Sequence, residues 1–314
     1  MDVLLLVIGF IIIIKASDVL VDAASSLALK LKIPKMLIAL TIVSFGTCAP
    51  EVAISFQSVH NGDGQMAFAN VIGSCIVNAF LILGLASFLR PIKVKHATIK
   101  KELPILFLVT TVFSVLMLDR LFNPHTRNAF SRVDGIILLL LFCLFVVYLV
   151  QMLFQHNKEE EVTKGKYSTL QSCIFLALSI LFIIFSSDLI VDSAKNIATT
   201  LGVSEKIITM FAVVIGTSLP EMVMTVSSAR KGEFDIAIGN IIGTNIFNIC
   251  IVLGLPIVIC GDILLTGFGL IDILVVFLSS FLLFLFARSE RTLNKKEGFM
   301  MLLIFLAYYL YLLI

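Results

Sequence analysis

The residues best suited to chemistry are two glutamates in nearly identical apolar segments. One segment, SFGTCAPEVAIS, runs from Ser44 to Ser55, and the other, VIGTSLPEMVMT, runs from Val214 to Thr225. Neither glutamate, Glu51 or Glu221, has a Lys or Arg in its own segment. An ionisable group inside an apolar helix is costly and marks an ion pathway more often than packing. The duplication therefore predicts a functional pair of carboxylates.

A proline directly precedes each glutamate, at Pro50 and Pro220. Proline donates no N–H, and its ring crowds the carbonyl four residues back, which is that of Gly46 in the first segment. We expect the helix to kink or unwind there and to free carbonyls between Ser44 and Thr47. Unwound backbone at membrane depth needs protein or a hydrated cavity to satisfy it.

Polar residues also recur every four positions in NVIGSCIVN and NIIGTNIFN, which follow the two glutamate segments. Residues four apart share one helical face. The small residues of Ala69xxxGly73 and Gly239xxxGly243 should let the second and third helices of each half approach closely. The side chains expected to gather near the midplane are Glu51, Glu221, Thr47, Thr217, Ser218, Ser74, Thr244, Asn78, Asn248, Asn70 and Asn240.

Such a set of oxygens suits a hard cation. Ca²⁺ takes six to eight oxygen ligands at roughly 2.3–2.6 Å, whereas transition metals prefer His or Cys. Two glutamates cancel one divalent ion, and the empty site would need Na⁺ or protons instead, which is a physical basis for antiport. Asn70 and Asn240 could instead bond helix to helix.

The remaining polar residues have either two possible roles or an ordinary position at the solvated surface. Four aspartates either line a permeation path or, as we favour, lie at the membrane interface near Lys15, Lys30 or Lys195; they are Asp18, Asp22, Asp188 and Asp192. The four histidines fall in predicted loops or at helix ends, where solvated surface is expected.

The rest of the chain indicates a helical membrane protein. It has 314 residues, of which 59% are hydrophobic and 14% charged, too few charges for a soluble domain. A hydrocarbon core about 30 Å thick needs roughly 20 apolar residues per helix. We predict an all-α polytopic protein whose ten transmembrane helices lie at 3–27, 36–59, 66–89, 102–119, 134–154, 169–198, 207–229, 235–260, 268–287 and 297–314.

These helices form two related units. At an offset of 170 residues, the 69 pairs from Ser17/Ser187 to Leu85/Leu255 include 24 identities without a gap, polar matches such as Asn78/Asn248 among them. Five helices per unit is an odd number, which predicts inverted five-helix repeats. The first repeat spans 1–154 with its signature at 44–85, a linker follows at 155–168, and the second repeat spans 169–314 with its signature at 214–255.

The loops predict the orientation. Seventeen Lys and Arg lie in loops on the linker side and four in the opposite loops, so the linker should be cytoplasmic and both termini extracytoplasmic. We expect a multi-pass protein of the inner cell membrane whose partner is the lipid bilayer. The net charge of +2 gives no reason to expect a nucleic-acid partner, and no obligate protein partner or cofactor is indicated.

On its paired GTxxPE segments, at Gly46 to Glu51 and Gly216 to Glu221, the chain resembles the cation/calcium exchanger superfamily, and most of all its compact prokaryotic sodium/calcium exchangers. The resemblance covers essentially the whole chain. It implies an antiporter with four cation sites in a diamond between the second, third, seventh and eighth helices, with the first and sixth helices sliding as a gate.

Roles carried over by motif position are also implied by the resemblance. Glu51 and Glu221 match shared central ligands, and Thr47 and Thr217 match threonines whose carbonyls complete the calcium site. Further matches are Ser74, Ser218 and the Val214 carbonyl for an external sodium site, and Thr244 and the Ser44 carbonyl for an internal one.

Two positions depart from the family. Cys48 stands where Ser is usual, and a thiol is a poor Na⁺ ligand, so the internal site would be weak or would use a carbonyl or water. Asn248 stands where some members have Asp, which lowers the site charge by one and argues against potassium co-transport.

The expected function is Na⁺/Ca²⁺ antiport by alternating access, with Ca²⁺/H⁺ antiport in the same fold as the alternative. The hydroxyls and carbonyls beyond the glutamates favour sodium. A membrane hydrolase is disfavoured because neither a Ser/His/Asp set nor HExxH appears, so we do not expect an enzyme. A passive channel would conduct without a counter-ion, and saturable exchange would exclude it.

Overall fold

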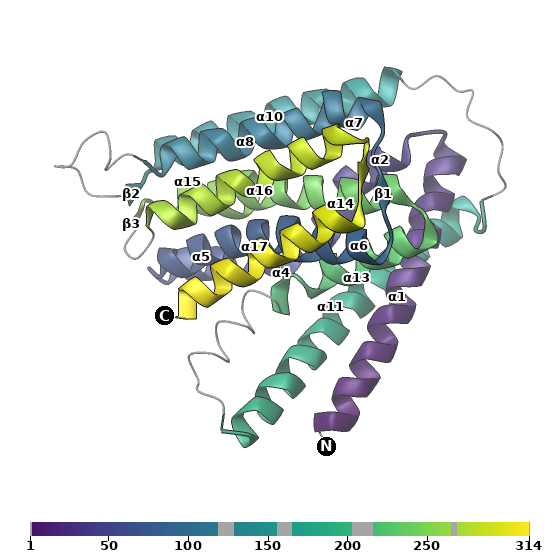
Figure 1. Cartoon of the computed structure of the whole chain (residues 1–314), viewed down its shortest axis with the longest axis horizontal. Coiled ribbons are helices and arrows are strands. Elements are labelled where there is room, and N and C mark those ends of the chain that lie inside the picture. The colour runs from purple at the N-terminus through teal and green to yellow at the C-terminus, as the bar shows by residue number, and fades with distance from the viewer. Residues whose placement is uncertain (1, 119–128, 156–164, 203–215, 265–268, 314) are drawn as a thin grey trace.

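The computed structural model describes residues 2–118, 129–155, 165–202, 216–264 and 269–313, and these are mostly helical (Figure 1). Two-residue strands and π-helical stretches, labelled η, interrupt the helices. The first half contains α1 (Asp2–Leu31), α2 (Lys35–Ile38), η1 (Ala39–Val43), α3 (Ser44–Thr47), α4 (Ala49–His60), α5 (Gly64–Ile76), η2 (Val77–Ile82), α6 (Leu83–Leu89), β1 (Ile92–Lys93), α7 (His96–Lys100), α8 (Glu102–Leu116), β2 (Ala129–Phe130) and α10 (Arg132–Gln155).

The second half repeats much of this order. It contains α11 (Thr169–Thr200), α13 (Leu219–Lys231), α14 (Phe234–Phe247), η3 (Asn248–Leu253), α15 (Gly254–Cys260), β3 (Ile263–Leu264), α16 (Leu270–Ser289), β4 (Thr292–Leu293) and α17 (Lys295–Leu313).

Each of the ten predicted segments corresponds to a helix or helical run in the described residues, which confirms the all-α prediction. Six described runs are long and apolar enough to cross a membrane, and a seventh qualifies if the bent pair Lys35–Thr47 and Ala49–His60 is one span. Helices α8, α13 and α17 fall outside that criterion over the part of the chain that is described.

The outer helices need a lipid environment. In α10, large apolar side chains such as Phe154 and Leu144 are 81% and 64% exposed. A helix that is apolar on its exposed side is stable against acyl chains and not against water.

Two helical runs lie at the centre. The α5–η2–α6 and α14–η3–α15 runs are 78% and 83% buried over their most apolar windows, far more than the other spans. The recurring Asn and Ser/Thr residues lie on these two runs and are therefore shielded from lipid.

Helices α1 and α11 pack together and stand apart from the bundle of the other helices (Figure 1). Gly9 of α1 makes the close approach possible, because a Cβ there would lie 2.7 Å from Cγ1 of Ile190 on α11. The pair shares an apolar core with α2, η1 and α13 that is separate from the main core.

Small antiparallel ladders tie the two halves together at opposite ends of the bundle (Figure 1). Strand β1 of the first half pairs with β4 of the second, with Ile92 opposite Leu293. Strand β2 of the first half pairs with β3 of the second, with Phe130 opposite Ile263. Each ladder thus joins one strand from each half.

Candidate cation site

The site is built on two helix breaks that occupy equivalent positions. Helix α3 ends and α4 begins around Cys48, whose φ of −77° and ψ of 0° lie outside ideal helical values, and the two helical segments meet at 49°. In the second half, α13 begins after Ser218, whose φ is −89° and ψ 4°. Cys48 and Ser218 are 170 residues apart. The kink predicted at Pro50 is confirmed in the first half, and the described residues of the second half show a helix break at the equivalent position.

The prolines lie in the first turns of α4 and α13. A proline is tolerated there because the first helical N–H groups have no partner within the helix. Glu51 and Glu221 follow in the same turns, where the positive end of the helix dipole favours a negative charge.

Both glutamates are fully buried, and none of their four carboxylate oxygens has a hydrogen-bond partner among the described residues. Glu51 lies close enough to Glu221 to experience its charge, and Thr47 lies beside Glu221. The ion pairs found among the described residues involve neither glutamate. Two buried, unpaired carboxylates would be strongly destabilising unless a cation or protons neutralised them.

Further unpartnered polar atoms come from the central helical runs and the break at Ser218. They are the Oγ atoms of Ser74 and Ser218, Oγ1 of Thr244, Oδ1 of Asn78, and both amide atoms of Asn248. All of these residues are 0% exposed. Buried polar groups in native proteins are nearly always paired, so this set fits a bound oxygen-seeking ion.

Asn78 and Asn248 lie at the start of η2 and η3. Single-turn π-helical segments inside α-helices occur mostly at functional sites, since the wider turn re-aims a side chain. Asn78 donates from Nδ2 to Oδ1 of Asn245 over 2.9 Å, which leaves its own Oδ1 unpartnered.

Asn245 was missed by the sequence reasoning. It lies off the four-residue stripe, and its counterpart in the first half is Cys75, so neither spacing nor duplication could reveal it. Its Nδ2 also donates to the Cys75 carbonyl over 3.5 Å. Asn245 therefore orients Asn78 from the other half of the molecule.

Other predicted site residues have protein partners. Ser44 donates from Oγ to the carbonyls of Ala39 and Asn240, at 2.7 and 3.1 Å, and its own carbonyl accepts the N–H of Cys48 at 3.0 Å. The prediction that the Ser44 carbonyl is freed by unwinding is therefore wrong, because the last turn of α3 uses it. Thr217 donates to Oδ1 of Asn70 over 3.4 Å. Val214 lies outside the described residues.

Asn240 donates from Nδ2 to Oγ1 of Thr225 over 3.1 Å, which is a helix-to-helix bond, while its own Oδ1 is unpartnered like that of Asn78, so both interpretations stay open. Cys48 is fully buried and lies near both glutamates and the hydroxyl of Thr244. Its position is therefore consistent with the predicted ligand set.

The second and third helices of each half contact each other as predicted, but Gly239 and Gly243 face a different neighbour. A Cβ at Gly243 would lie 2.3 Å from Oγ of Ser44 and 3.0 Å from Cα of Leu40, and one at Gly239 would meet Met36. The glycine face of α14 therefore packs on the second helix of the other half, while α14 also contacts α13, the helix that precedes it in its own half.

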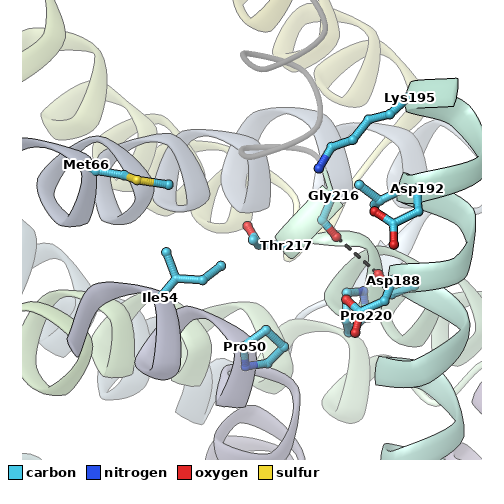
Figure 2. A pocket seen from close by; sticks show the side chains of 11 residues that line it. Pro50, Ile54, Met66, Asp188, Asp192, Lys195, Gly216, Thr217 and Pro220 are labelled. Atoms are coloured by element: carbon cyan, nitrogen blue, oxygen red, sulfur yellow. Dashed lines mark hydrogen bonds between the residues drawn. The ribbon is translucent and has the colours of Figure 1, made fainter. Parts of the chain in front are cut away.

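A pocket of about 270 Å³ reaches the break in the second half. Figure 2 shows Asp188, Asp192 and Lys195 on one wall and Ile54 on another, with Thr217 between them. Asp188 and Asp192 thus line a pocket together with Lys195, an arrangement compatible with both interpretations of these aspartates.

Asp18 and Asp22 of α1 take part in a closed polar cluster. Asp22 pairs with Lys166 at 2.7 Å and with Lys231 at 2.6 Å, and Oγ of Ser227 donates to Asp18 over 2.6 Å. The hydrogen bond to Asp22 raises the pKa of the exposed Lys166 amine. The expected ionic contact is present, although Lys166 and Lys231 provide it and not Lys15 or Lys30. We call these contacts the α1 latch.

The arrangement defines a class: a multi-pass helical membrane protein that buries unpartnered oxygen-bearing side chains between its central helices. The family model "Sodium/calcium exchanger protein" matches residues 1–151 and 171–314. The chain therefore belongs to the sodium/calcium exchanger family.

Individual relatives agree with this assignment. The chain is 36% identical to the inner membrane protein YrbG of Escherichia coli over 81% of this chain and 79% of that protein. It is 34% identical to the putative antiporter CaxA of Alkalimonas amylolytica over 96% and 95%. A solved structure of the sodium–calcium exchanger NCX_Mj, soaked with zero Na⁺ and Ca²⁺, superposes with a TM-score of 0.84 and 27% identity, covering 98% of this chain and 97% of that one.

Proposed function

We propose that the chain exchanges Ca²⁺ for Na⁺ across the inner membrane by alternating access. The observation that carries this proposal is the pair of buried, unpartnered carboxylates at equivalent helix breaks, surrounded by unpartnered hydroxyl and amide oxygens. Similarity to a solved sodium–calcium exchanger over nearly the whole chain supports it.

In this proposal Glu51 and Glu221 are ligands of one Ca²⁺ ion, whose two charges they cancel. The carbonyls of Thr47 and Thr217 and the amides of Asn78 and Asn248 complete the shell. Among the described residues, no group of three or more His, Cys, Asp and Glu gathers. A site made mainly of neutral oxygens around two carboxylates suits Ca²⁺ and Na⁺ better than a transition metal.

Sodium ions would bind beside the same glutamates when Ca²⁺ leaves. Ser74, Ser218 and the Val214 carbonyl would form one site. Thr244 would form the other with Cys48 or a carbonyl other than that of Ser44, which already accepts from the N–H of Cys48 and from Oγ1 of Thr47.

Alternating access rests on ten crossings in two inverted repeats. The ladders support this, because strands exchanged between the halves at opposite ends of the bundle are what a two-fold axis in the membrane plane would produce. The equivalent breaks at Cys48 and Ser218 support it further. By the distribution of Lys and Arg, the α1 latch lies on the cytoplasmic side and the pocket beside Asp188 on the outer side.

The two repeats are in different states. Asp18 and Asp22 of α1 contact Ser227 and Lys231 of α13. The equivalent aspartates of α11, Asp188 and Asp192, line the open pocket. Exchanging the conformations of the halves would bring Asp188 to Gln57 and Asp192 to Asn61, the counterparts of Ser227 and Lys231 by the 170-residue offset. That exchange would close the outer pocket and open the latch.

A second candidate is Ca²⁺/H⁺ exchange. Cys48 favours proton exchange, because its buried thiol stands where a hydroxyl would bind Na⁺. The glutamates could then release Ca²⁺ when they bind protons. The unpartnered hydroxyls of Ser74, Ser218 and Thr244 favour sodium, because a carboxylate that only takes protons needs no such neighbours.

The test is ⁴⁵Ca²⁺ uptake into proteoliposomes loaded with Na⁺ or choline, each with and without a pH gradient. We expect uptake that requires internal Na⁺ and that is lost in Glu51→Gln and Glu221→Gln. Glu102→Gln is the matched control, because Glu102 is also a buried carboxyl, 2% exposed, but bonds to Tyr148. Uptake driven by the pH gradient alone would establish the proton alternative, and uptake without any counter-ion would overturn antiport.

A further inference from the structure

A second pocket has a volume of about 480 Å³ and shares no lining residue with the cation site. It is formed where α7 and the start of α8 face the end of α16 and the turn before β4. Its lining residues are His96, Ile99, Lys100, Pro104, Phe284, Arg288 and Arg291. The basic residues among them, His96, Lys100, Arg288 and Arg291, belong to the connections on the linker side, where most of the Lys and Arg lie.

The lining carries one sign of charge. Lys100, Arg288 and Arg291 are cationic, His96 can become so, and the lining contains no acidic residue. Among the described residues, the ion pairs involve none of these four side chains. The nearby Glu297 is engaged elsewhere: it accepts from Ser289 and from the backbone N–H of Asn294 at the start of α17.

The backbone holds Arg291 in place. Its φ of 53° is left-handed, a conformation that is strained for a residue with a Cβ. The β1–β4 ladder fixes it, since the N–H of Val94 donates to the Arg291 carbonyl over 2.8 Å and Lys93 pairs with Thr292 next to it. The guanidinium is therefore presented by a constrained turn and not by a free loop.

The remaining lining is apolar. Ile99, Pro104 and Phe284 lie beside the basic residues, at the ends of helices whose next turns are apolar throughout. A ligand that fits this combination has an anionic phosphate at one end and hydrocarbon at the other. Arginine suits the phosphate because its planar fork can bond two oxygens at once.

We propose that this pocket binds the phosphate headgroup of an anionic phospholipid from the cytoplasmic leaflet. Basic pockets between helix ends on that side are known to suit such headgroups. The lipid would bridge α7–α8 to α16–β4, which already pack together. None of these elements is α1 or α11, the two helices proposed to move. The binding is thus separate from the transported ions and does not depend on which counter-ion is used.

The test is native mass spectrometry of the purified full chain with dihexanoyl phosphatidylglycerol, compared with dihexanoyl phosphatidylcholine and with inorganic phosphate as a competitor. We expect phosphatidylglycerol to bind and the Arg288→Gln/Arg291→Gln variant to bind it roughly thirtyfold more weakly, at about fivefold per lost charge. Lys295→Gln/Lys296→Gln is the matched control, because it removes the same charge from exposed residues on the same side that do not line the pocket.

Equal weakening in both double variants, or none in either, would overturn the proposal, since the attraction would then be diffuse. If the arginine pair does not fold, Lys100→Gln on α7 tests the same pocket, with a loss of roughly fivefold expected and no loss overturning it. Displacement of the lipid by millimolar inorganic phosphate would show that the pocket takes phosphate from solution, which overturns the lipid as its source. Equal binding of phosphatidylcholine would overturn the charge selectivity.

Discussion

At the scale of single residues, the two glutamates and Cys48 decide the chemistry. Glu51 and Glu221 are buried without partners, so the empty site is costly and the protein gains stability by binding a cation or protons. The halves differ most at one ligand position: the second half offers the hydroxyl of Ser218, while the first half offers the thiol of Cys48. A hydroxyl is the harder ligand and binds Na⁺ more strongly.

Replacing Cys48 by Ser should therefore strengthen sodium binding. We expect Cys48→Ser to lower the Na⁺ concentration that half-saturates Ca²⁺ exchange severalfold, equivalent to roughly 1 kcal/mol, the typical net value of one added polar contact. The measurement is ⁴⁵Ca²⁺ exchange over a range of Na⁺ concentrations. Cys75→Ser, which changes another buried thiol, is the control, and an unchanged Na⁺ dependence in Cys48→Ser would show that Cys48 is not a ligand.

At the scale of elements, α1 and α11 have the same kind of aspartates but different surroundings. The α1 latch joins α1 to α13 and, through Lys166, to the end of the linker. The counterpart positions in the first half, Gln57 and Asn61, are uncharged and exposed. In the proposed cycle, the cytoplasmic side would therefore close with ion pairs and the outer side with amides alone, which would favour the outward-open state.

Breaking the latch should shift the protein towards the inward-open state. We expect Lys231→Gln to reduce the outward-open population roughly fivefold relative to the inward one, since a partly exposed ion pair contributes up to about 1 kcal/mol. The measurement is the labelling rate of Ile54→Cys, which lines the outer pocket, by an impermeant maleimide after Cys143 and Cys173 are replaced by Ala. Lys30→Gln, an exposed lysine of α1 outside the latch, should leave the rate unchanged. A normal rate in Lys231→Gln would mean that the latch carries no bias.

At the scale of the whole molecule, the proposed function depends on two halves that can exchange conformations. The exchanged β-ladders and the equivalent breaks are common to both halves, and the contacts of α1 and α11 are not. The elements proposed to move, α1 and α11, thus have different contacts in the two halves.

An outer latch can be built from the repeat itself. We expect Asn61→Lys to place an amine opposite Asp192 when the outer pocket closes, and so to lower the labelling of Ile54→Cys by a factor similar to that of Lys231→Gln. Combining the two substitutions should lower it further. Asn61→Gln controls for side-chain size, and faster labelling in Asn61→Lys would contradict the proposed exchange of contacts.

Much of this protein follows from its sequence, because hydropathy, proline chemistry and internal duplication act locally. Apolar segments of about 20 residues form helices wherever they enter a membrane, and Pro50 and Pro220 break theirs without tertiary help. The duplication singled out Glu51, Glu221 and the stripes around Asn78 and Asn248, since matched polar residues cannot arise from apolar composition.

Tertiary structure alone decided which surfaces meet and which polar groups are already used. Asn245 of the second half forms a hydrogen bond with Asn78 of the first. Gly243 lies directly against Ser44 of the other half, and Lys166 at the end of the linker pairs with Asp22. None of these contacts has a local pattern, because each joins residues more than 140 positions apart. The repeat predicts two equivalent halves, but a carrier in any one state must hold them unequally, so the open pocket and the closed latch could be known only from the folded chain.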